Sequence, residues 1–435
     1  MHSPLWWRNG PHIPVELLAL QLRPAAHYPT VVSIESGPDS YHIMAWKSEL
    51  SFSERLAVIT SITNACRRAS PSTEFAMAHS EATRIEGEAY ANASSKDEYH
   101  VTCQKAIDGY DNQDVALGDE ESLTEWSTRV KAEIESRRGE KVGLYEKAVH
   151  DKDGLFSSIY KSTTSEGLLV ALKVTTPHLT EPPHDSEREA RLLKQVSSET
   201  IIPLLESFHE GGSHFVLVFP YMRYQLDELF HGNQLTPRQI RSHLRDLFRA
   251  LAHIHSMGII HRDVKPSNVL LRGLGGPAYL ADFGIAWSPD DKSSEAPDEK
   301  ITDVGTTCYR PPEILFGNKT YDTSLDMWAA GCVVAEAIEP DHPQLFDAGP
   351  VGSELALVHS IFTTLGTPTA ESWPSRKNMP DWGKIEFREY SPRTWDKVLG
   401  KAPSLGRDLV ANLVKYEGSE RLTAEKVLED PFLTF

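Results

Sequence analysis

Four short motifs in a fixed order constrain the fold of this 435-residue chain more than any other feature. They are Val170-Ala-Leu-Lys173, His261-Arg-Asp-Val-Lys-Pro-Ser-Asn268, Asp282-Phe-Gly284 and Arg310-Pro-Pro-Glu313. A lone tripeptide such as Asp282-Phe-Gly284 arises by chance in a long chain, but the four motifs together at these spacings do not. The fold must therefore bring their charged and amide side chains to one site.

The residue types in these motifs are those that phosphoryl transfer requires. The transferred group passes through a loose, highly charged transition state, so an enzyme must position an alcohol and neutralise phosphate oxygens. We expect Asp263 to orient the alcohol and accept its proton, and Lys265 to reach the γ-phosphate of ATP. Asn268 and Asp282 offer oxygen ligands for Mg²⁺. A lysine two residues after the aspartate resembles serine/threonine rather than tyrosine kinases.

A single lysine interrupts the apolar run of residues 168–174, which reads as a buried strand. Lys173 needs a carboxylate partner there, in order to be held against the α- and β-phosphates. Glu189, on a helical segment, is the expected partner, and Glu187 is its competitor. The spacing to the apolar pair Leu192-Leu193 favours Glu189.

The glycine-rich loop expected over the phosphates is degenerate. The pattern G-x-G-x-x-G-x-V falls on Lys152, Gly154, Ser157 and Ile159, so that only the middle glycine remains, and Phe156 keeps the aromatic tip. Taken alone, this segment is an ordinary hairpin. It permits a rival interpretation, in which a kinase-like scaffold binds nucleotide poorly.

Five residues are candidates for contacts with adenine. Phe219 is the expected gatekeeper, and Pro220 is tolerable because its carbonyl, not its missing N–H, faces the base. Met222 should supply the remaining backbone hydrogen bonds, with Ala171 and Leu270 above and below the ring. Ordinary core packing accounts equally well for the first three.

The motifs lie late in the chain, which predicts two regions. We expect residues 144–435 to form an α+β catalytic domain with a bilobal fold, a β-rich N-lobe and a helical C-lobe. Residues 1–143 carry none of the motifs and are expected to be a partly helical extension of unknown function.

Two capping boxes predict helices in the extension. Ser51-Phe-Ser-Glu54 precedes apolar residues at helical spacing and a stop near residues 67–71. Ser122-Leu-Thr-Glu125 precedes Trp126, Val130 and Ile134, with an end at Gly139. Residues 80–120 are polar and acidic without a clear period, and Trp6-Trp7 reads as a packing anchor. We expect these helices to pack on each other or on the catalytic domain.

Composition restricts the partners. The net charge is −18 and the pI is about 5.5, which argues against nucleic acid or an anionic membrane as a bulk electrostatic partner. No apolar run approaches the roughly 20 residues that span a bilayer, and none resembles a signal peptide. The four cysteines show no disulfide-like spacing, which suits the cytosol or nucleus. They are Cys66, Cys103, Cys308 and Cys332.

Residues 144–435 resemble the cyclin-dependent branch of the eukaryotic protein kinases. The branch-level motifs are Gly305-Thr-Thr-Cys-Tyr-Arg-Pro-Pro-Glu313, Tyr321-Asp-Thr-Ser-Leu-Asp-Met-Trp328, Gly331-Cys332, and Leu365-Gly-Thr-Pro368 followed by Trp373-Pro374.

The resemblance implies structural roles for residues outside the reacting groups. Asp326 would anchor the catalytic loop, residues 261–268, and Glu313 would pair with Arg421. Thr306 would bridge toward Asp263 and Lys265.

Departures from this branch concern its regulation. In Pro183-His-Asp-Ser-Glu-Arg-Glu189, Glu187 replaces the isoleucine that packs into a cyclin. Ile301 stands at the position of the phosphorylated threonine, and Trp287 at one of the arginines that receive the phosphate. The inhibitory Thr-Tyr pair of the glycine-loop tip is Leu155-Phe156, which cannot be phosphorylated.

These shared absences resemble the monomeric CDK-activating kinases of fungi. The resemblance implies a monomer that phosphorylates the activation loop of a cyclin-dependent kinase without a cyclin of its own. We expect apolar packing between the end of the Asp282-Phe-Gly284 segment, near Trp287, and the substrate platform, near Ile301, to order the loop permanently, unless the adjacent Thr302 carries a phosphate. Arg310 beside Gly305 leaves a preference for proline after the target residue undecided.

Two alternatives remain open from the sequence. One is a cyclin-dependent-like kinase with an unrelated substrate. The other is a catalytically weak scaffold whose function lies in residues 1–140. The complete set of reactive groups favours catalysis over the scaffold, and these groups are Lys173, Asp263, Asn268 and Asp282.

Overall fold

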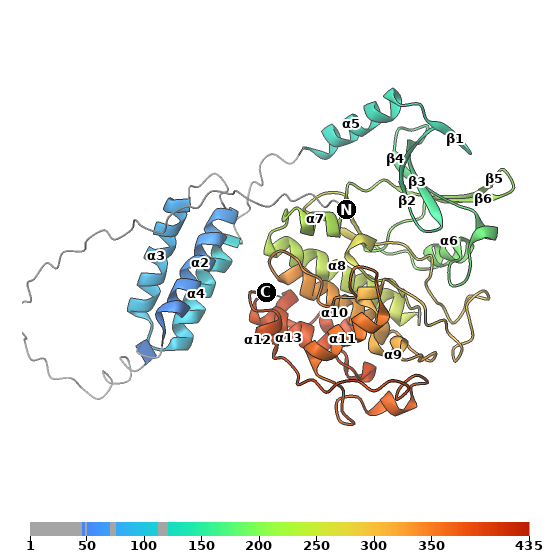
Figure 1. Cartoon of the computed structure of the whole chain (residues 1–435). Coiled ribbons are helices and arrows are strands. Elements are labelled where there is room, and N and C mark those ends of the chain that lie inside the picture. The colour runs from blue at the N-terminus through green and yellow to red at the C-terminus, as the bar shows by residue number, and fades with distance from the viewer. Residues whose placement is uncertain (1–45, 48–49, 70–74, 112–120, 435) are drawn as a thin grey trace, which may run out of the picture.

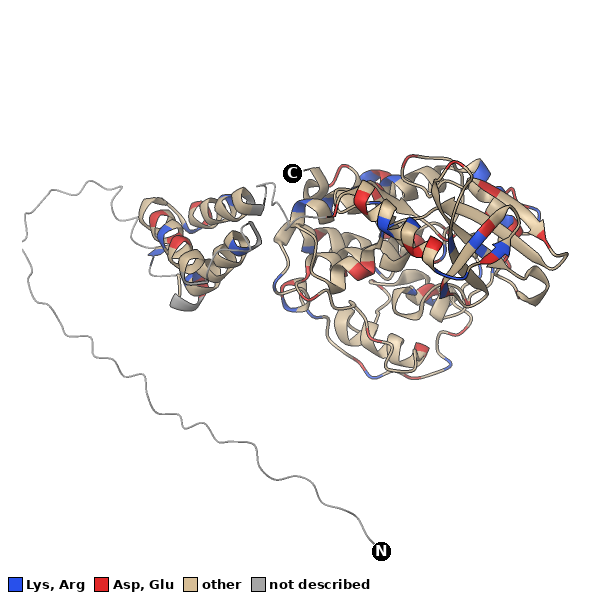
Figure 2. Ribbon diagram, turned by 90° about the horizontal axis from the view of Figure 1, so that it is seen from above, with Lys and Arg blue, Asp and Glu red and all other residues tan. Residues whose placement is uncertain are grey.

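The computed structural model describes residues 46–47, 50–69, 75–111 and 121–434. Trp6-Trp7 and the expected stop signal at Pro71 lie outside the described residues. Figure 1 shows a group of three helices that precedes a two-lobed part. Acidic and basic residues are interspersed along the helices and strands (Figure 2). Among the described helices, none combines the length and the hydropathy that a membrane span requires.

The three helices, α2 (Phe52–Ala69), α3 (Phe75–Asn92) and α4 (Lys96–Asp111), pack on one another (Figure 1). The capping box predicted for α2 is present, since Ser51 N–H donates to the Glu54 carboxylate at 2.7 Å and Glu54 N–H donates to Ser51 Oγ at 3.2 Å. Between the helices, the buried Glu86 carboxylate accepts hydrogen bonds from Arg55 and from the Tyr99 hydroxyl.

Helices α3 and α4 occupy much of the segment for which the sequence showed no clear period. The buried face of α3 consists of small and polar side chains, which give little hydrophobic signal. Its residues recur at helical spacing, at Ala78, Ala82, Glu86 and Ala89. The period was therefore present, but it was carried by alanines and a paired glutamate.

The N-lobe is built on a six-stranded sheet with the order β1-β2-β3-β4-β6-β5. Helix α6 (Ser186–Gln195) packs against it and contacts β6. The antiparallel register places Lys173 of β4 between Ile159 and Leu217 of the neighbouring strands. The strands are β1 (Glu140–Val142), β2 (Tyr145–Asp153), β3 (Ser157–Thr163), β4 (Leu169–Thr175), β5 (Glu206–Glu210) and β6 (His214–Pro220).

Helix α5 (Leu123–Ser136) packs on this sheet, against β2 and β3. Its predicted capping box is present at Ser122, and its apolar stripe is buried against Val149 and Leu169. The stripe consists of Trp126, Val130 and Ile134. The boundary expected after residue 143 lies between β1 and β2. Helix α5 and strand β1, which precede this point, pack with the strands of the N-lobe.

The C-lobe is helical and surrounds the buried helix α10 (Figure 1). A small sheet of β7 (Tyr224–Gln225), β8 (Val269–Leu271) and β9 (Ala278–Leu280) flanks the catalytic loop. The helices are α7 (Leu226–His231), α8 (Pro237–Ser256), α9 (Pro312–Leu315), α10 (Ser324–Ile338), α11 (Glu354–Leu365), α12 (Trp395–Val398), α13 (Ser404–Leu413), α14 (Ala424–Val427) and α15 (Pro431–Thr434).

The packing of α5 can be tested with Trp126→Ala. The Trp126 ring stacks on Tyr221, with centroids 6.1 Å apart, and is 8% exposed. Its removal should lower the free energy of unfolding by about 3 kcal/mol, near the low end for a buried tryptophan. The matched control is Leu123→Ala on the same helix, which is 47% exposed and should change it by less than about 0.5 kcal/mol. Equal effects in urea unfolding, followed by circular dichroism, would contradict the assignment of α5 to the N-lobe.

Candidate active site

The catalytic loop is fixed by a carboxylate on the buried helix α10. Asp326, which is fully buried, accepts hydrogen bonds from the backbone N–H of His261 at 2.8 Å and of Arg262 at 2.9 Å. His255 Nε2 lies 2.8 Å from the same carboxylate. Burial alone would raise the pKa of Asp326, but these hydrogen bonds outweigh it and hold the pKa below its usual value. The anchoring predicted for Asp326 is therefore present in the structure.

Asp263 lies at the centre of a polar cluster. The backbone N–H and hydroxyl of Thr306 donate to Asp263 Oδ1 at 3.0 and 2.9 Å. Lys265 Nζ lies 2.9 Å from Asp263 Oδ2 and donates to Thr306 Oγ1 at 2.8 Å. Asn268 Nδ2 donates to Asp263 Oδ2 at 3.0 Å. The carboxylate is held in one orientation by groups from two segments of the chain, as a proton acceptor in phosphoryl transfer has to be.

The predicted lysine–glutamate pair is formed by Glu189. Lys173 Nζ donates to both Glu189 oxygens, at 2.9 and 2.8 Å, and to Asp282 Oδ1 at 2.7 Å. Glu187 instead is half exposed and lies 3.7 Å from His209 Nε2. Burial lowers the pKa of Lys173, but the two carboxylates outweigh it and raise the pKa above its usual value. Three charged groups distant in sequence are therefore brought to one point of the cleft.

The Asp282-Phe-Gly284 motif has a half-exposed carboxylate and a buried phenyl ring. Phe283 is fully buried, and its ring lies 4.8 Å from the His261 ring. Asp282 has the left-handed φ of +65°, which aspartate tolerates better than most residues. The Lys173 ammonium holds the pKa of Asp282 well below its usual range, so this carboxylate is ionised.

The donor set fits a hard divalent cation. The Asn268 side-chain NH₂ donates to the carbonyl and carboxylate of Asp263, so its amide oxygen takes no part in those bonds. Asp282 offers a carboxylate that is 47% exposed and bonds Lys173 through only one oxygen. Amide and carboxylate oxygens are ligands suited to Mg²⁺, which keeps several waters and binds together with substrate phosphates.

The degenerate glycine loop forms the turn between β2 and β3. Gly154 N–H donates to the Ser157 carbonyl at 2.7 Å, which closes the hairpin. The Phe156 ring at the tip lies 4.5 Å from the ring of His184, just before α6. This contact, which was not predicted, fixes the loop through side chains. In the sequence, the signals for this contact were the aromatic residue at the loop tip and the histidine just before α6.

The predicted adenine contacts are partly buried and lie along the boundary of the two lobes. Ala171 on β4 and Phe219 on β6 are partners across the sheet, as are Val170 and Pro220. Met222 follows β6. Three residues after Met222, Gln225 pairs with Leu270 of β8. The structure therefore brings these residues near one another, while their contact with a base stays a prediction.

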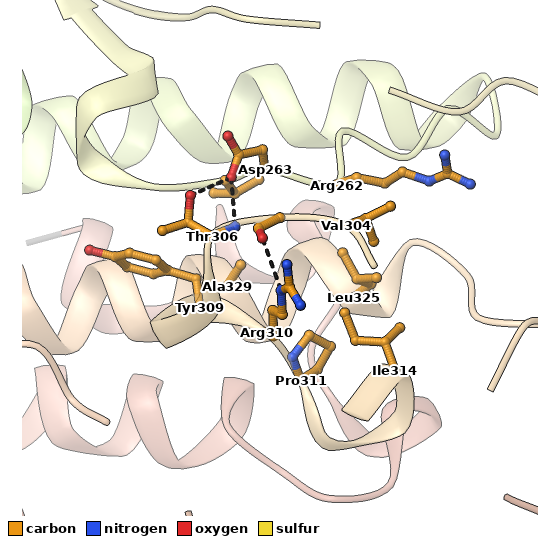
Figure 3. A pocket seen from close by; sticks show the side chains of 12 residues that line it. Arg262, Asp263, Val304, Thr306, Tyr309, Arg310, Pro311, Ile314, Leu325 and Ala329 are labelled. Atoms are coloured by element: carbon orange, nitrogen blue, oxygen red, sulfur yellow. Dashed lines mark hydrogen bonds between the residues drawn. The ribbon is translucent and has the colours of Figure 1, made fainter. Parts of the chain in front are cut away.

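Figure 3 shows side chains that line a small pocket, among them Asp263 and Arg310. Arg310 in its wall donates from Nε to the Gly305 carbonyl at 2.9 Å and pairs with Asp303 and Glu354. Gly305 has a φ of +76°, and a Cβ there would lie 2.6 Å from the Arg262 carbonyl oxygen. Glycine is required at this position, because backbone meets backbone there.

The activation segment, residues 282–313, is ordered by apolar packing at the expected place. Trp287 exchanges two backbone hydrogen bonds with Ile260, each 2.9 Å long, and belongs to a buried cluster against which Ile301 packs. The Tyr321 hydroxyl donates to the Ile301 carbonyl at 2.6 Å. The two positions therefore meet in one apolar cluster, while the permanent order of the loop stays a prediction. Glu313 also pairs with Arg421, at 2.6 and 2.7 Å.

Comparison with known proteins agrees with this geometry. The protein kinase domain pattern matches residues 152–433, about two-thirds of the chain. The chain belongs to the protein kinase family. It is 34% identical to the serine/threonine-protein kinase csk1 of Schizosaccharomyces pombe over 291 residues, which covers 64% of this chain and 91% of csk1. It is also 31% identical to cyclin-dependent kinase 20 of rat and of mouse, over 63% of this chain and 79% of each relative.

These relatives place the kinase among serine/threonine kinases of the cyclin-dependent type. Protein kinases use ATP with divalent metal ions and act on protein substrates. The scaffold interpretation has no support from the geometry, since the charged groups are assembled in one cleft.

The assigned ion pair predicts an order of effects in this kinase. Glu189→Gln leaves Lys173 with Asp282 alone, so the lysine should shift and kcat should fall by about 10²-fold, as expected for displacement of a positioning group by about 1 Å. Glu187→Gln is the matched control on the same helix and should leave kcat near that of the unmodified protein. Kinetics of phosphate transfer from labelled ATP test this, and the reverse ranking would move the ion pair to Glu187.

The relaxed glycine loop predicts tolerance of Gly154→Ala. An added Cβ would lie 3.0 Å from Ser157 Oγ, which can rotate away, and the backbone does not need a left-handed φ there. We expect the KM for ATP to rise by less than about threefold, far below the effect of Lys173→Met. Comparable increases for the two variants would show that the loop backbone binds the phosphates tightly.

Proposed function

We propose that this kinase phosphorylates the activation loop of a cyclin-dependent kinase, and that it acts as a monomer without a cyclin. One observation carries the proposal. The groups of the reaction are assembled in a chain that has no phosphorylatable residue at Ile301 and no apolar anchor at Glu187. An enzyme that activates other kinases has to be active before them, and an autonomous catalytic site meets that requirement. The resemblance to monomeric CDK-activating kinases of fungi supports the same substrate.

In the proposed mechanism, Asp263 receives the hydroxyl of the target serine or threonine. The hydroxyl oxygen forms a bond to the γ-phosphorus as the bond to the bridging β-γ oxygen breaks, the proton passes to Asp263, and ADP leaves. Lys265 and Lys173 neutralise phosphate oxygens, and Thr306 keeps the Asp263 carboxylate oriented. Asn268 and Asp282 would hold Mg²⁺, which supplies further charge neutralisation on the phosphates when bound.

The exposed side chain of Glu187, near the start of α6, supports activity without a conventional cyclin. The Glu187 side chain is 50% exposed and lies beside His209. A charged carboxylate is costly to bury in an apolar pocket, because it loses its hydration there. A partner that requires an isoleucine at this position would therefore bind weakly.

Asp263→Asn tests the role of the proton acceptor. The amide keeps the size of the side chain but cannot take the proton, so kcat should fall by about 10²–10⁴-fold. Circular dichroism and thermal unfolding should show an intact fold. A folded variant with nearly unchanged turnover would contradict the mechanism.

The substrate is tested with bacterially expressed, phosphatase-treated protein and an unphosphorylated cyclin-dependent kinase. Mass spectrometry should find phosphate on the activation-loop threonine of the substrate, without added cyclin. Thr302→Ala should be as active as the unmodified protein, because the proposal needs no phosphate at Thr302. Activity on a generic protein substrate, with none on the cyclin-dependent kinase, would indicate another substrate. Absence of both would favour the scaffold.

A further inference from the structure

Arg262 of the catalytic loop carries a charge that has to be neutralised inside the protein. Its side chain is fully buried, and its guanidinium lies over the Tyr321 ring, 5.4 Å from the centroid. A buried charge without a partner is strongly destabilising, because it has lost its hydration. In a kinase that is switched by phosphorylation, arginines of this kind order the activation segment by binding the phosphate. Here the position of the phosphorylated residue is Ile301.

The counter-charge is a glutamate earlier in the same segment. Arg262 Nη1 and Nη2 each donate to the Glu295 carboxylate at 3.2 Å. Burial alone would raise the pKa of Glu295, but the hydrogen bonds from Arg262 outweigh it and keep the pKa below its usual value. Glu295 is thus ionised at neutral pH. The Glu295 carboxylate is therefore paired with the arginine that would bind a phosphate in a kinase switched by phosphorylation.

The backbone of Glu295 is held by the residue that replaces a phosphate-binding arginine. The Trp287 indole N–H donates to the Glu295 carbonyl at 2.9 Å. The Lys300 ammonium lies over the ring of Trp287, 4.4 Å from its centroid. The tryptophan therefore fixes both the apolar cluster and the new counter-ion of Arg262.

A second carboxylate ties the same stretch to α6. Arg191 donates to both oxygens of Asp291, at 2.7 and 3.0 Å, and Asp291 is 8% exposed. The Ser293 hydroxyl donates to Asp185, the residue that caps α6, at 2.8 Å. Because α6 also carries Glu189, these contacts connect the activation segment to the ion pair of Lys173.

We propose that Glu295 and Asp291 are positioning residues that replace the regulatory phosphate and stabilise α6, the helix that carries Glu189. Glu295 holds the activation segment against the catalytic loop, and Asp291 holds it against α6. The inference rests on the autonomous activity proposed above, but it does not depend on the identity of the protein substrate.

Glu295→Gln tests the first contact, with Glu299→Gln as the matched control. Glu299 lies in the same segment, and its carboxylate forms an exposed ion pair with Lys319. We expect Glu295→Gln to lower kcat by about 10- to 100-fold, since displacement of a positioned group by about 1 Å can have this effect. The KM for ATP should change little, and Glu295→Asp, which keeps the charge, should recover part of kcat. Glu299→Gln should resemble the unmodified protein.

Asp291→Asn tests the second contact, with the exposed Asp290→Asn as its control. It keeps the proposal testable should Glu295→Gln fold poorly. Asp291→Asn should lower kcat by about tenfold, through a looser α6. Unchanged kcat in folded Glu295→Gln and Asp291→Asn would overturn the proposal, as would equal losses in the variants and their controls.

All variants are measured on a generic basic protein and on an unphosphorylated cyclin-dependent kinase. If the unmodified protein phosphorylates only the generic protein, the proposed substrate is wrong, and the effects of Glu295 and Asp291 are still read on that protein. If it is active only after its own phosphorylation, the positioning role is wrong.

Discussion

The structure depends on the neutralisation of one buried guanidinium. Arg262 lies in the catalytic loop with a left-handed φ of +70°, and its side chain is removed from water. Its N–H is held by Asp326, its carbonyl meets Gly305, and its guanidinium meets Glu295. The loop that positions Asp263 therefore depends on two neighbours, helix α10 and the activation segment, to hold its conformation.

Contacts lead from this arginine to the nucleotide side of the cleft. Glu295 and Asp291 lie four residues apart, and one binds the catalytic loop while the other binds α6. Helix α6 in turn presents Glu189 to Lys173. In kinases with a phosphate switch, one added phosphate orders these parts. This chain has permanent carboxylates and the apolar cluster of Trp287 and Ile301 in the same region.

The sequence predicted most of the site because its residues lie in short motifs of fixed spacing. The lysine–glutamate pair, the anchor at Asp326 and the packing of Ile301 all follow from such positions. The contact of Glu295 with Arg262 could not be predicted, because a glutamate 33 residues away in a polar stretch carries no local signal. Its partner depends on how the chain returns to the catalytic loop.

The fold of the N-terminal region was harder to predict for a similar reason. Capping boxes identified α2 and α5, but α3 was hidden by a buried face of alanines and a paired glutamate. The placement of α5 on the N-lobe also depended on tertiary packing, since the stripe of Trp126 fits a helical bundle as well as a sheet.

Hydrogen exchange of the full-length, phosphatase-treated protein tests the central claim most directly. If permanent carboxylates and apolar packing order the activation segment, the hydrogen-bonded amides of residues 288–304, such as those of Ser288, Ser294 and Lys300, are protected without any phosphate. Protection should extend to the N–H groups that the structure pairs, such as that of Trp287 with the Ile260 carbonyl. Exchange of this segment at the rate of an unstructured peptide, slowed only after phosphorylation, would contradict the account.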